Sequence, residues 1–368
     1  MKVGNRHYRS LWADPSGLSV QIIDQARLPH VFETRTIASV DAMAEAITAM
    51  RVRGAPLIGV AAAFGLALAA VRDPSDESVS RASTQLRATR PTAVNLQWAI
   101  GRMRERLAPL APAERARAAW AEAQAIAEED VALNEAIGRN GLAILEREYA
   151  ARNRPINILT HCNAGWIATV DWGTVTAPIF MAHDRGIPVH VWVDETRPRN
   201  QGLLTAWELA QHGVPHTLVT DNAGGHLMQR GQVDLVLVGA DRVSRRGDVC
   251  NKIGTYLKAL AARANNIPFY AAVPTPTIDW GIDDALAEMP IEERSADEVR
   301  IVRGLDPEGR FSQVTIAPST TAVANPAFDV TPASLVTGII TELGVARALE
   351  RELLAFWPRH QESKAYLT

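Results

Sequence analysis

Cysteine is scarce in this chain of 368 residues, which contains two, Cys162 and Cys250. So small a set cannot build a disulfide scaffold and fits a reducing compartment, so we expect two free thiols. The first residues also lack the apolar stretch that a secretory signal needs. Together these absences predict a cytoplasmic protein.

A strong charge of either sign is absent as well. The formal net charge is -3, which excludes the basic surplus typical of proteins that bind the phosphate backbone of nucleic acids. The nine histidines are scattered without the spacing of zinc ligands. No Gly-x-Gly-x-x-Gly motif follows a predicted strand. We therefore expect no nucleic-acid partner, no metal and no nicotinamide cofactor.

Long apolar runs are limited to one uncharged stretch, residues 54–71. Its length approaches the minimum that can span a bilayer. However, it is rich in Ala and Gly and hence weakly apolar, and Pro56 suits the first turn of a helix. We interpret it as a buried core helix, and we expect no membrane association.

The sequence that is present divides into two regions with different periodicity. Residues 1–150 predict a mainly helical N-terminal domain with a few short strands. The expected strands are 18–23 and 35–37, and the expected helices are 40–50, 56–71, 92–107 and 113–149, the last interrupted near Gly138 and Gly141.

Residues 151–368 instead alternate short β-branched runs with helical patterns. Such alternation is typical of an α/β fold, and it predicts a Rossmann-like parallel sheet with crossover helices. The expected strands are 156–159, 189–193, 217–220, 233–238 and 269–273, and the expected helices are 174–184, 203–211, 223–229, 254–264 and, at the end, 334–356.

Two of the predicted strands end in residues that can carry chemistry. The apolar run 233–238 leads to Asp241, and the run 156–159 leads to Cys162. Ligands of open α/β sheets bind where strands end, so an acid and a thiol can face one crevice. Burial beside an apolar strand raises the pKa of a carboxyl group, which would let Asp241 carry a proton near neutral pH. The alternatives are that Asp241 caps a helix and that Cys162 is a small buried hydrophobic residue.

Three further segments suit an anion. Gly54 lets the backbone approach a ligand at the start of the 56–71 helix, and Arg53 beside it offers a guanidinium group. Arg90 precedes the next helix, and Asn251 with Lys252 precedes another. A single arginine before a helix is usually solvated, so the prediction of an anion site depends on the three segments taken together.

Taken together, these motifs resemble the methylthioribose-1-phosphate isomerase family, which is related to the regulatory α, β and δ subunits of the eukaryotic translation-initiation nucleotide-exchange factor. The matching stretches occur in order along nearly the whole chain: 22–25, 50–56, 90–96, 160–165, 194–198, 238–241, 251–256 and 325–329. The resemblance implies that Asp241 is the proton donor and that Cys162 is the second catalytic group. It also implies a homodimer and a set of substrate-binding residues comprising Arg53, Gly54, Ala55, Arg90, Gln201, Asn251 and Lys252.

The resemblance implies an aldose-ketose isomerase that acts on the sugar 1-phosphate 5-methylthioribose 1-phosphate in methionine salvage. A 1-phosphate blocks ordinary ring opening, so an acid must act on the ring oxygen; Cys162 would then take the C2 proton as a thiolate or assist a hydride shift from C2 to C1. The chain departs from the family pattern at Trp166 and Cys250, beside the expected pocket. A related isomerase of 5-deoxyribose 1-phosphate or ribose 1,5-bisphosphate is therefore an alternative, and a non-catalytic subunit that senses a sugar phosphate or nucleotide is a third.

Overall fold

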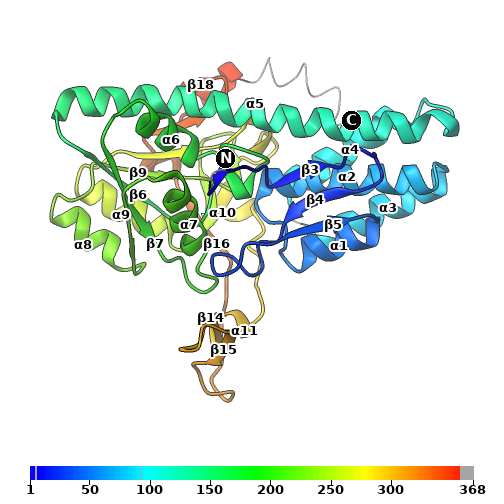
Figure 1. Cartoon of the computed structure of the whole chain (residues 1–368). Helices are drawn as coiled ribbons and strands as arrows, with labels where there is room; N and C mark the ends of the chain where they lie inside the picture. Colours follow the sequence, from blue (N-terminus) through cyan, green and yellow to red (C-terminus); the bar gives the residue numbers. More distant parts are fainter. Residues whose placement is uncertain (5, 92, 357–368) are drawn as a thin grey trace.

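The computed structural model describes residues 1–4, 6–91 and 93–356. The predicted first residue of the 92–107 helix, Thr92, lies outside these ranges. The N-terminal region contains two small antiparallel sheets and the first five helices (Figure 1). Their bounds are β1 Lys2–Val3, β2 Arg6–His7, β3 Leu11–Ala13, β4 Val20–Ile23, β5 Thr34–Ile37, α1 Val40–Thr48, α2 Ala55–Arg72, α3 Asp76–Thr89, α4 Val94–Leu107 and α5 Pro112–Arg152.

Helix α2 is the centre of the N-terminal region. By length and composition it could cross a membrane, yet 78% of its apolar window is buried inside the protein. It packs against α1, α3, α4 and α5, and its residues Phe64 and Leu66 are fully buried in the main core of this region. These contacts favour the interpretation of 54–71 as a core helix.

Helix α5 is continuous, so the predicted interruption near Gly138 and Gly141 is wrong. These glycines lie where α5 crosses α6: a Cβ on Gly138 would be 2.9 Å from the Cβ of Ala177, and one on Gly141 would be 2.8 Å from the Cβ of Pro178. The missing side chains let the two helices approach closely. At its other half α5 packs on α2 and α4, so it extends along both regions (Figure 1).

The second region is built on a seven-stranded sheet with the order β18-β17-β12-β9-β6-β7-β8. All neighbours pair in parallel except β17 and β18. Five predicted strands and the four helices between 174 and 264 are confirmed, with the bounds β6 Ile156–Thr160, α6 Thr176–Asp184, β7 Val189–Asp194, α7 Gly202–His212, β8 His216–Val219, α8 Ala223–Gln229, β9 Leu235–Val238, α9 Thr255–Ala264 and β12 Phe269–Ala272. The fold is therefore mixed α/β, with a mainly parallel sheet and a mainly helical part.

The predicted helix at 334–356 is wrong. The β-branched run that ends in Ile339 and Ile340 adds a parallel strand beside β12, because its fully buried side chains complete the core of the sheet. The segment forms η3 Ala333–Leu335, β17 Gly338–Thr341, β18 Gly344–Ala346, α12 Glu350–Leu353 and η4 Leu354–Phe356.

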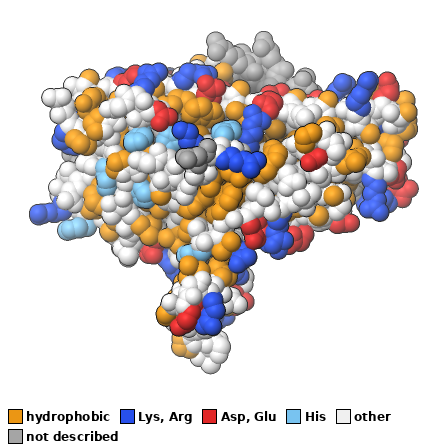
Figure 2. All heavy atoms as spheres, in the orientation of Figure 1, with side chains coloured by type: hydrophobic (Ala, Val, Ile, Leu, Met, Phe, Trp, Pro, Cys, Tyr) orange, Lys and Arg blue, Asp and Glu red, His pale blue; other side chains and the backbone are white. Residues whose placement is uncertain are grey.

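A four-stranded sheet that the sequence did not predict follows β9. Its order is β13-β10-β11-β16, with β10 Arg242–Ser244, β11 Val249–Lys252, β13 Ile278–Asp279 and β16 Phe328–Thr331. Between β13 and β16 lie α10 Ala285–Glu288, α11 Asp297–Arg300 and a hairpin of β14 Ile301–Leu305 and β15 Phe311–Thr315. The hairpin projects from the body of the molecule (Figure 1). Figure 2 shows hydrophobic side chains gathered over the middle of the visible face, above the hairpin.

Candidate active site

Cys162 and Asp241 come together beyond the ends of two paired strands. Cys162 follows β6 and Asp241 follows β9, and these strands are parallel neighbours in the sheet. From β6 the chain proceeds to β7 and β8 on one side, whereas β9 and β12 lie on the other side. Both residues therefore lie where the strand order reverses, which is where open α/β sheets bind their ligands.

One cavity contains every site residue that the sequence predicted. The structure thus brings together residues from both regions of the chain, although their roles stay predictions. The cavity lining includes Arg53, Gly54, Ala55, Arg90, Cys162, Gln201, Asp241, Asn251 and Lys252.

The turn at Cys162 is held by two threonine hydroxyl groups. The backbone of Cys162 is left-handed, with φ of 68°. Its N–H donates to Oγ1 of Thr196 at 2.8 Å, and its carbonyl oxygen accepts from Oγ1 of Thr205 at 2.8 Å. Burial raises the pKa of the thiol, and the positive charges of Lys252 and Arg53 oppose that rise. The hydrogen bonds thus fix the backbone of Cys162, and burial favours the neutral thiol.

Asp241 has the environment that its position after an apolar strand predicted. Burial raises the pKa of its carboxyl group, while Lys252, Arg90 and Arg53 act in the opposite direction. No helix follows it, because the chain continues directly into β10, so the helix-cap alternative is wrong. Its backbone N–H instead donates to the carbonyl oxygen of Cys250 at 3.0 Å.

Lys252 brings a positive charge close to both Cys162 and Asp241. Its ammonium lies 4.5 Å from the ring centroid of Phe328, and the residue is 8% exposed. Burial lowers its pKa, whereas the negative charges of ionised Cys162 and Asp241 would raise it. It lies on β11, so the missed sheet is the element that places Asn251 and Lys252 in the cavity.

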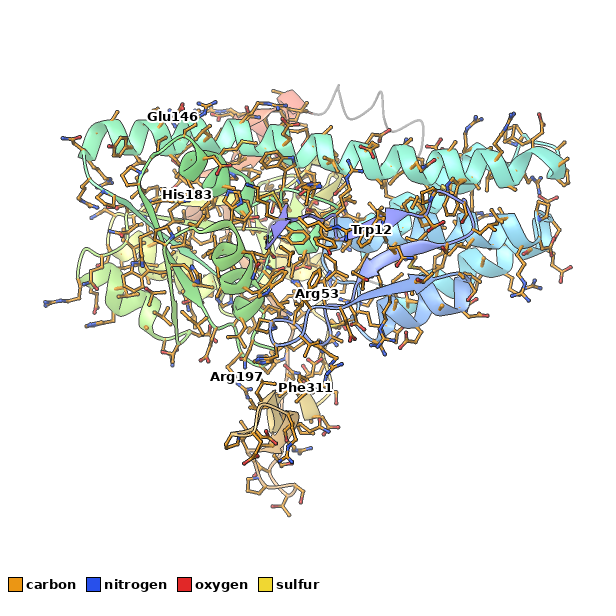
Figure 3. The ribbon with its side chains drawn as sticks, in the orientation of Figure 1. Trp12, Arg53, Glu146, His183, Arg197 and Phe311 are labelled. Atoms are coloured by element: carbon orange, nitrogen blue, oxygen red, sulfur yellow. The ribbon has the colours of Figure 1, made fainter. Side chains whose placement is uncertain are left out.

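Arg53 lies between the helical region and the sheet (Figure 3). Its guanidinium donates to Oδ1 of Asn163 at 2.6 Å and 3.1 Å. Asn163 in turn donates to Glu208 at 2.7 Å, and Glu208 also accepts the N–H of Trp166 at 2.7 Å. Burial raises the pKa of Glu208 to about 7. Glu208, which sequence reasoning missed because it lies in mid-helix, therefore supports Arg53 indirectly.

The start of α2 also opens onto the cavity. Gly54 has φ of 98°, and a Cβ there would lie 2.4 Å from the carbonyl oxygen of Ala168, so no other residue fits without a backbone shift. Because α2 begins at Ala55, its first N–H groups are free of partners within the helix. The helix start therefore offers a site for an anion.

The remaining predicted residues contribute polar groups at the wall. Oε1 of Gln201 is buried and has no hydrogen-bond partner within the described residues. Nδ2 of Asn251 donates to Oγ1 of Thr255 at 3.0 Å. The guanidinium of Arg90 lies 3.4 Å from the carboxylate of Glu292. The orphaned Gln201 oxygen is available to a donor on a bound ligand.

His161, which also lines the cavity, forms a group with Asp194 and Asp221, and their potential ligand atoms are within 4.8 Å of one another. His161 contacts Oδ2 of Asp194 through Nδ1 at 2.9 Å and the carbonyl oxygen of Ile253 through Nε2 at 2.8 Å. The ammonium of Lys258 lies 3.3 Å from the same carboxylate. Both nitrogens of His161 already have partners, and the ammonium of Lys258 already neutralises the Asp194 carboxylate, so these residues do not fit a metal ion. Their contacts instead connect β6 to the turn after β11.

Comparisons with known proteins agree with this geometry. The model of the Initiation factor 2 subunit family matches residues 51–348. The methylthioribose-1-phosphate isomerase of Brucella anthropi is 59% identical over 362 residues, which cover 97% of this chain and 99% of that protein. The enzyme of the same name from Sinorhizobium medicae is 60% identical, with the same coverage.

Two solved structures are also similar. The 5-methylthioribose 1-phosphate isomerase of Pyrococcus horikoshii has a TM-score of 0.84 at 40% identity, covering 96% of this chain and 97% of that chain. The translation initiation factor eIF-2B subunit delta of A. fulgidus has a TM-score of 0.78 at 39% identity, covering 95% and 100%. The chain therefore belongs to the Initiation factor 2 subunit family and, within it, to the methylthioribose-1-phosphate isomerases.

Proposed function

We propose that this protein is an aldose-ketose isomerase that converts 5-methylthioribose 1-phosphate into 5-methylthioribulose 1-phosphate, a reaction of methionine salvage. The observation that carries the proposal is the meeting of Cys162 and Asp241 in a cavity that also contains Arg53, Arg90 and Lys252. The acid and thiol can act on the sugar, and the cations can bind its phosphate. The names of the similar proteins support the same substrate.

Ring opening is the step that needs an acid. The phosphate on C1 blocks the usual route, so the bond between C1 and the ring oxygen breaks only if that oxygen receives a proton. Asp241 is suited to donate it, because burial raises the pKa of its carboxyl group. C1 then carries the positive charge, which its phosphate oxygen shares.

A hydrogen must next move from C2 to C1. If it moves with its electron pair, C2 becomes the carbonyl carbon when its hydroxyl loses a proton, and the proton released replaces the one that Asp241 gave. This route needs no base to remove the hydrogen that is bonded to the C2 carbon. The raised pKa of the Cys162 thiol supports this route over proton abstraction by a thiolate, and we propose that the sulfur acts as a neutral, polarisable group near the reacting carbons.

The phosphate is proposed to bind at the start of α2. Free N–H groups and the helix dipole favour an anion there. Arg53 is held beside that helix start by Asn163, and Lys252 and Arg90 line the same cavity. Gln201 and Asn251 are proposed to bind the sugar hydroxyl groups.

Further features of the family resemblance remain part of the proposal. Counted along the chain, the six parallel strands have the order 3-2-1-4-5-6, which supports a Rossmann-like arrangement. The end of α5 at Arg152 supports a division into an N-terminal domain of residues 1–150 and a catalytic domain of residues 151–368. We also propose a cytoplasmic homodimer without cofactor; light scattering of the purified protein tests the dimer.

The proposed substrate is tested by assaying the purified protein with 5-methylthioribose 1-phosphate, 5-deoxyribose 1-phosphate and ribose 1,5-bisphosphate. We expect the highest kcat/KM for the first. A preference for the bisphosphate would contradict the assignment, and binding without turnover of any of the three would favour the sensing subunit. Substrate deuterated at C2 tests the hydrogen transfer, because a hydride shift retains the label at C1 in ordinary water.

A further inference from the structure

A second cavity, of about 390 Å³, adjoins the first and is lined by Met50, Arg53, Arg199 and Gln201 in common with it. Phe311 of the projecting hairpin borders this second cavity (Figure 3). Its apolar lining includes Leu28, Pro29, Leu203, Leu204 and Phe311, and its charged lining includes Asp297, Glu298 and Arg303. If the proposed function holds, the sugar occupies the first cavity, and its C5 substituent, on the side away from C1, has this second cavity within reach.

Glu298 lines the second cavity and forms ion pairs with Arg199, which lines both cavities, and with Arg294, which lines the first. Its Oε1 accepts from the guanidinium groups of Arg199 at 2.7 Å and Arg294 at 2.7 Å. Oε2 accepts from Nε of Arg294 at 3.0 Å and from Nδ2 of Asn325 at 3.3 Å. These contacts lower the pKa of Glu298 to about 2, so it is a carboxylate at any working pH.

The segment that carries Glu298 is fixed to the body of the protein. The N–H of Arg294 donates to the carbonyl oxygen of Asn325 at 3.0 Å, and Nδ2 of Asn325 donates to the carbonyl oxygen of Ser295 at 2.9 Å. A second carboxylate, that of Glu292, accepts from Arg294 at 2.7 Å. Arg199, which lines both cavities, and Arg294, which lines the first, are thus paired with carboxylates before any ligand binds.

Pairing changes what these arginines can recognise. Two free guanidinium groups at the mouth of a cavity would bind a phosphate well. Arg199 and Arg294 already share the carboxylate of Glu298, and a phosphate dianion would have to approach that negative charge closely. A thioether carries no charge and contacts the apolar lining.

We propose that Glu298 is a specificity-determining residue, which pairs with Arg199 and Arg294 and thereby excludes sugars with a phosphate on C5. The inference rests on the proposed function and extends it from the reacting end of the substrate to the C5 end. Glu298 acts through the two arginines and is therefore a positioning residue rather than a catalytic one.

The test is Glu298→Gln, which keeps the shape of the side chain and removes its charge. We expect kcat/KM for ribose 1,5-bisphosphate relative to 5-methylthioribose 1-phosphate to rise about tenfold, the effect of one charge-assisted contact of ordinary strength. A direct titration with inorganic phosphate needs no turnover: we expect one site per chain in the wild type and a second site in the variant.

Glu293→Gln is the matched control. Glu293 is exposed in the same segment and accepts the N–H of Asn325, a contact that a glutamine oxygen can keep. The proposal would be overturned if folded Glu298→Gln kept the wild-type ratio of the two kcat/KM values and the wild-type number of phosphate sites. An equal rise of the kcat/KM ratio in Glu293→Gln would overturn it as well. Should Glu298→Gln fail to fold, Glu298→Asp draws the carboxylate back from the arginines, and the absence of a smaller rise there would overturn it equally. Wild-type activity on the three sugars judges the proposed function separately.

Discussion

Cys162 and Asp241, the proposed catalytic residues, are held in different ways. Hydrogen bonds with the hydroxyl groups of Thr196 and Thr205 fix the backbone on both sides of the Cys162 α-carbon. The backbone N–H of Asp241 instead donates to the carbonyl oxygen of Cys250 in β11. The comparison indicates that side chains position the residue at the end of β6 and that backbone pairing positions the residue at the end of β9, whereas burial and the nearby cations act on the acidity of both.

The largest expected effect follows from removing the acidity of Asp241. Asp241→Asn keeps the size of the side chain but cannot donate a proton to the ring oxygen, so we expect kcat to fall by about 10³-fold. The dissociation constant of the substrate, measured by calorimetry, should change little, because a protonated carboxyl group and an amide are both neutral.

The binding measurement also tests the charge of Asp241. Substrate that binds much more tightly to Asp241→Asn would show that the wild-type carboxyl group is ionised and repels the phosphate. Asp283→Asn is the control, since Asp283 pairs with Arg246 outside the cavity. Near-normal turnover in Asp241→Asn would reject the acid assignment.

Cys162→Ser is expected to have a smaller effect, a loss of about 10²-fold in kcat. A hydroxyl group is less polarisable than a thiol and far harder to ionise, so a loss of many further orders of magnitude would favour the thiolate base over the hydride shift. The measurement is kcat with 5-methylthioribose 1-phosphate. Cys250→Ala, at the second free cysteine, is the control, and equal losses in both variants would contradict a specific role for Cys162.

The position of this pair could be predicted from the sequence, because it depends on local patterns. Apolar runs locate β6 and β9, and Cys162 and Asp241 follow directly. Glu298 could not be found in this way: Arg294 is four residues away, but Arg199, the partner that lines both cavities, is 99 residues away and belongs to no periodic pattern. Long-range ion pairs depend on how the elements pack, which no short stretch of sequence records.

The errors in the predicted fold have a similar origin. Gly138 and Gly141 lower local helix propensity and predicted an interruption. In the structure they allow the close contact of α5 with Ala177 and Pro178 of α6, and that packing outweighs their propensity. The expected helix at 334–356 is wrong because pairing with β12 makes Gly338–Thr341 a strand.

The smallest effect is expected from Thr196→Val, which tests whether the hydrogen bond between the backbone N–H of Cys162 and Thr196 positions the sulfur. Valine has nearly the shape of threonine but can neither accept the N–H of Cys162 nor donate to the carbonyl oxygen of Asp194, so two groups lose a partner, at a cost of about 1–3 kcal/mol each in folding free energy. We expect kcat to fall several-fold with little change in KM, because the turn shifts while the proposed phosphate site at α2 does not. Thr217→Val, which removes an exposed hydroxyl from the edge strand β8, supplies the control for both thermal stability and rate. If Thr196→Val lowers stability but leaves kcat unchanged, the sulfur does not depend on this hydrogen bond, and the contrast between the ends of β6 and β9 does not extend to catalysis.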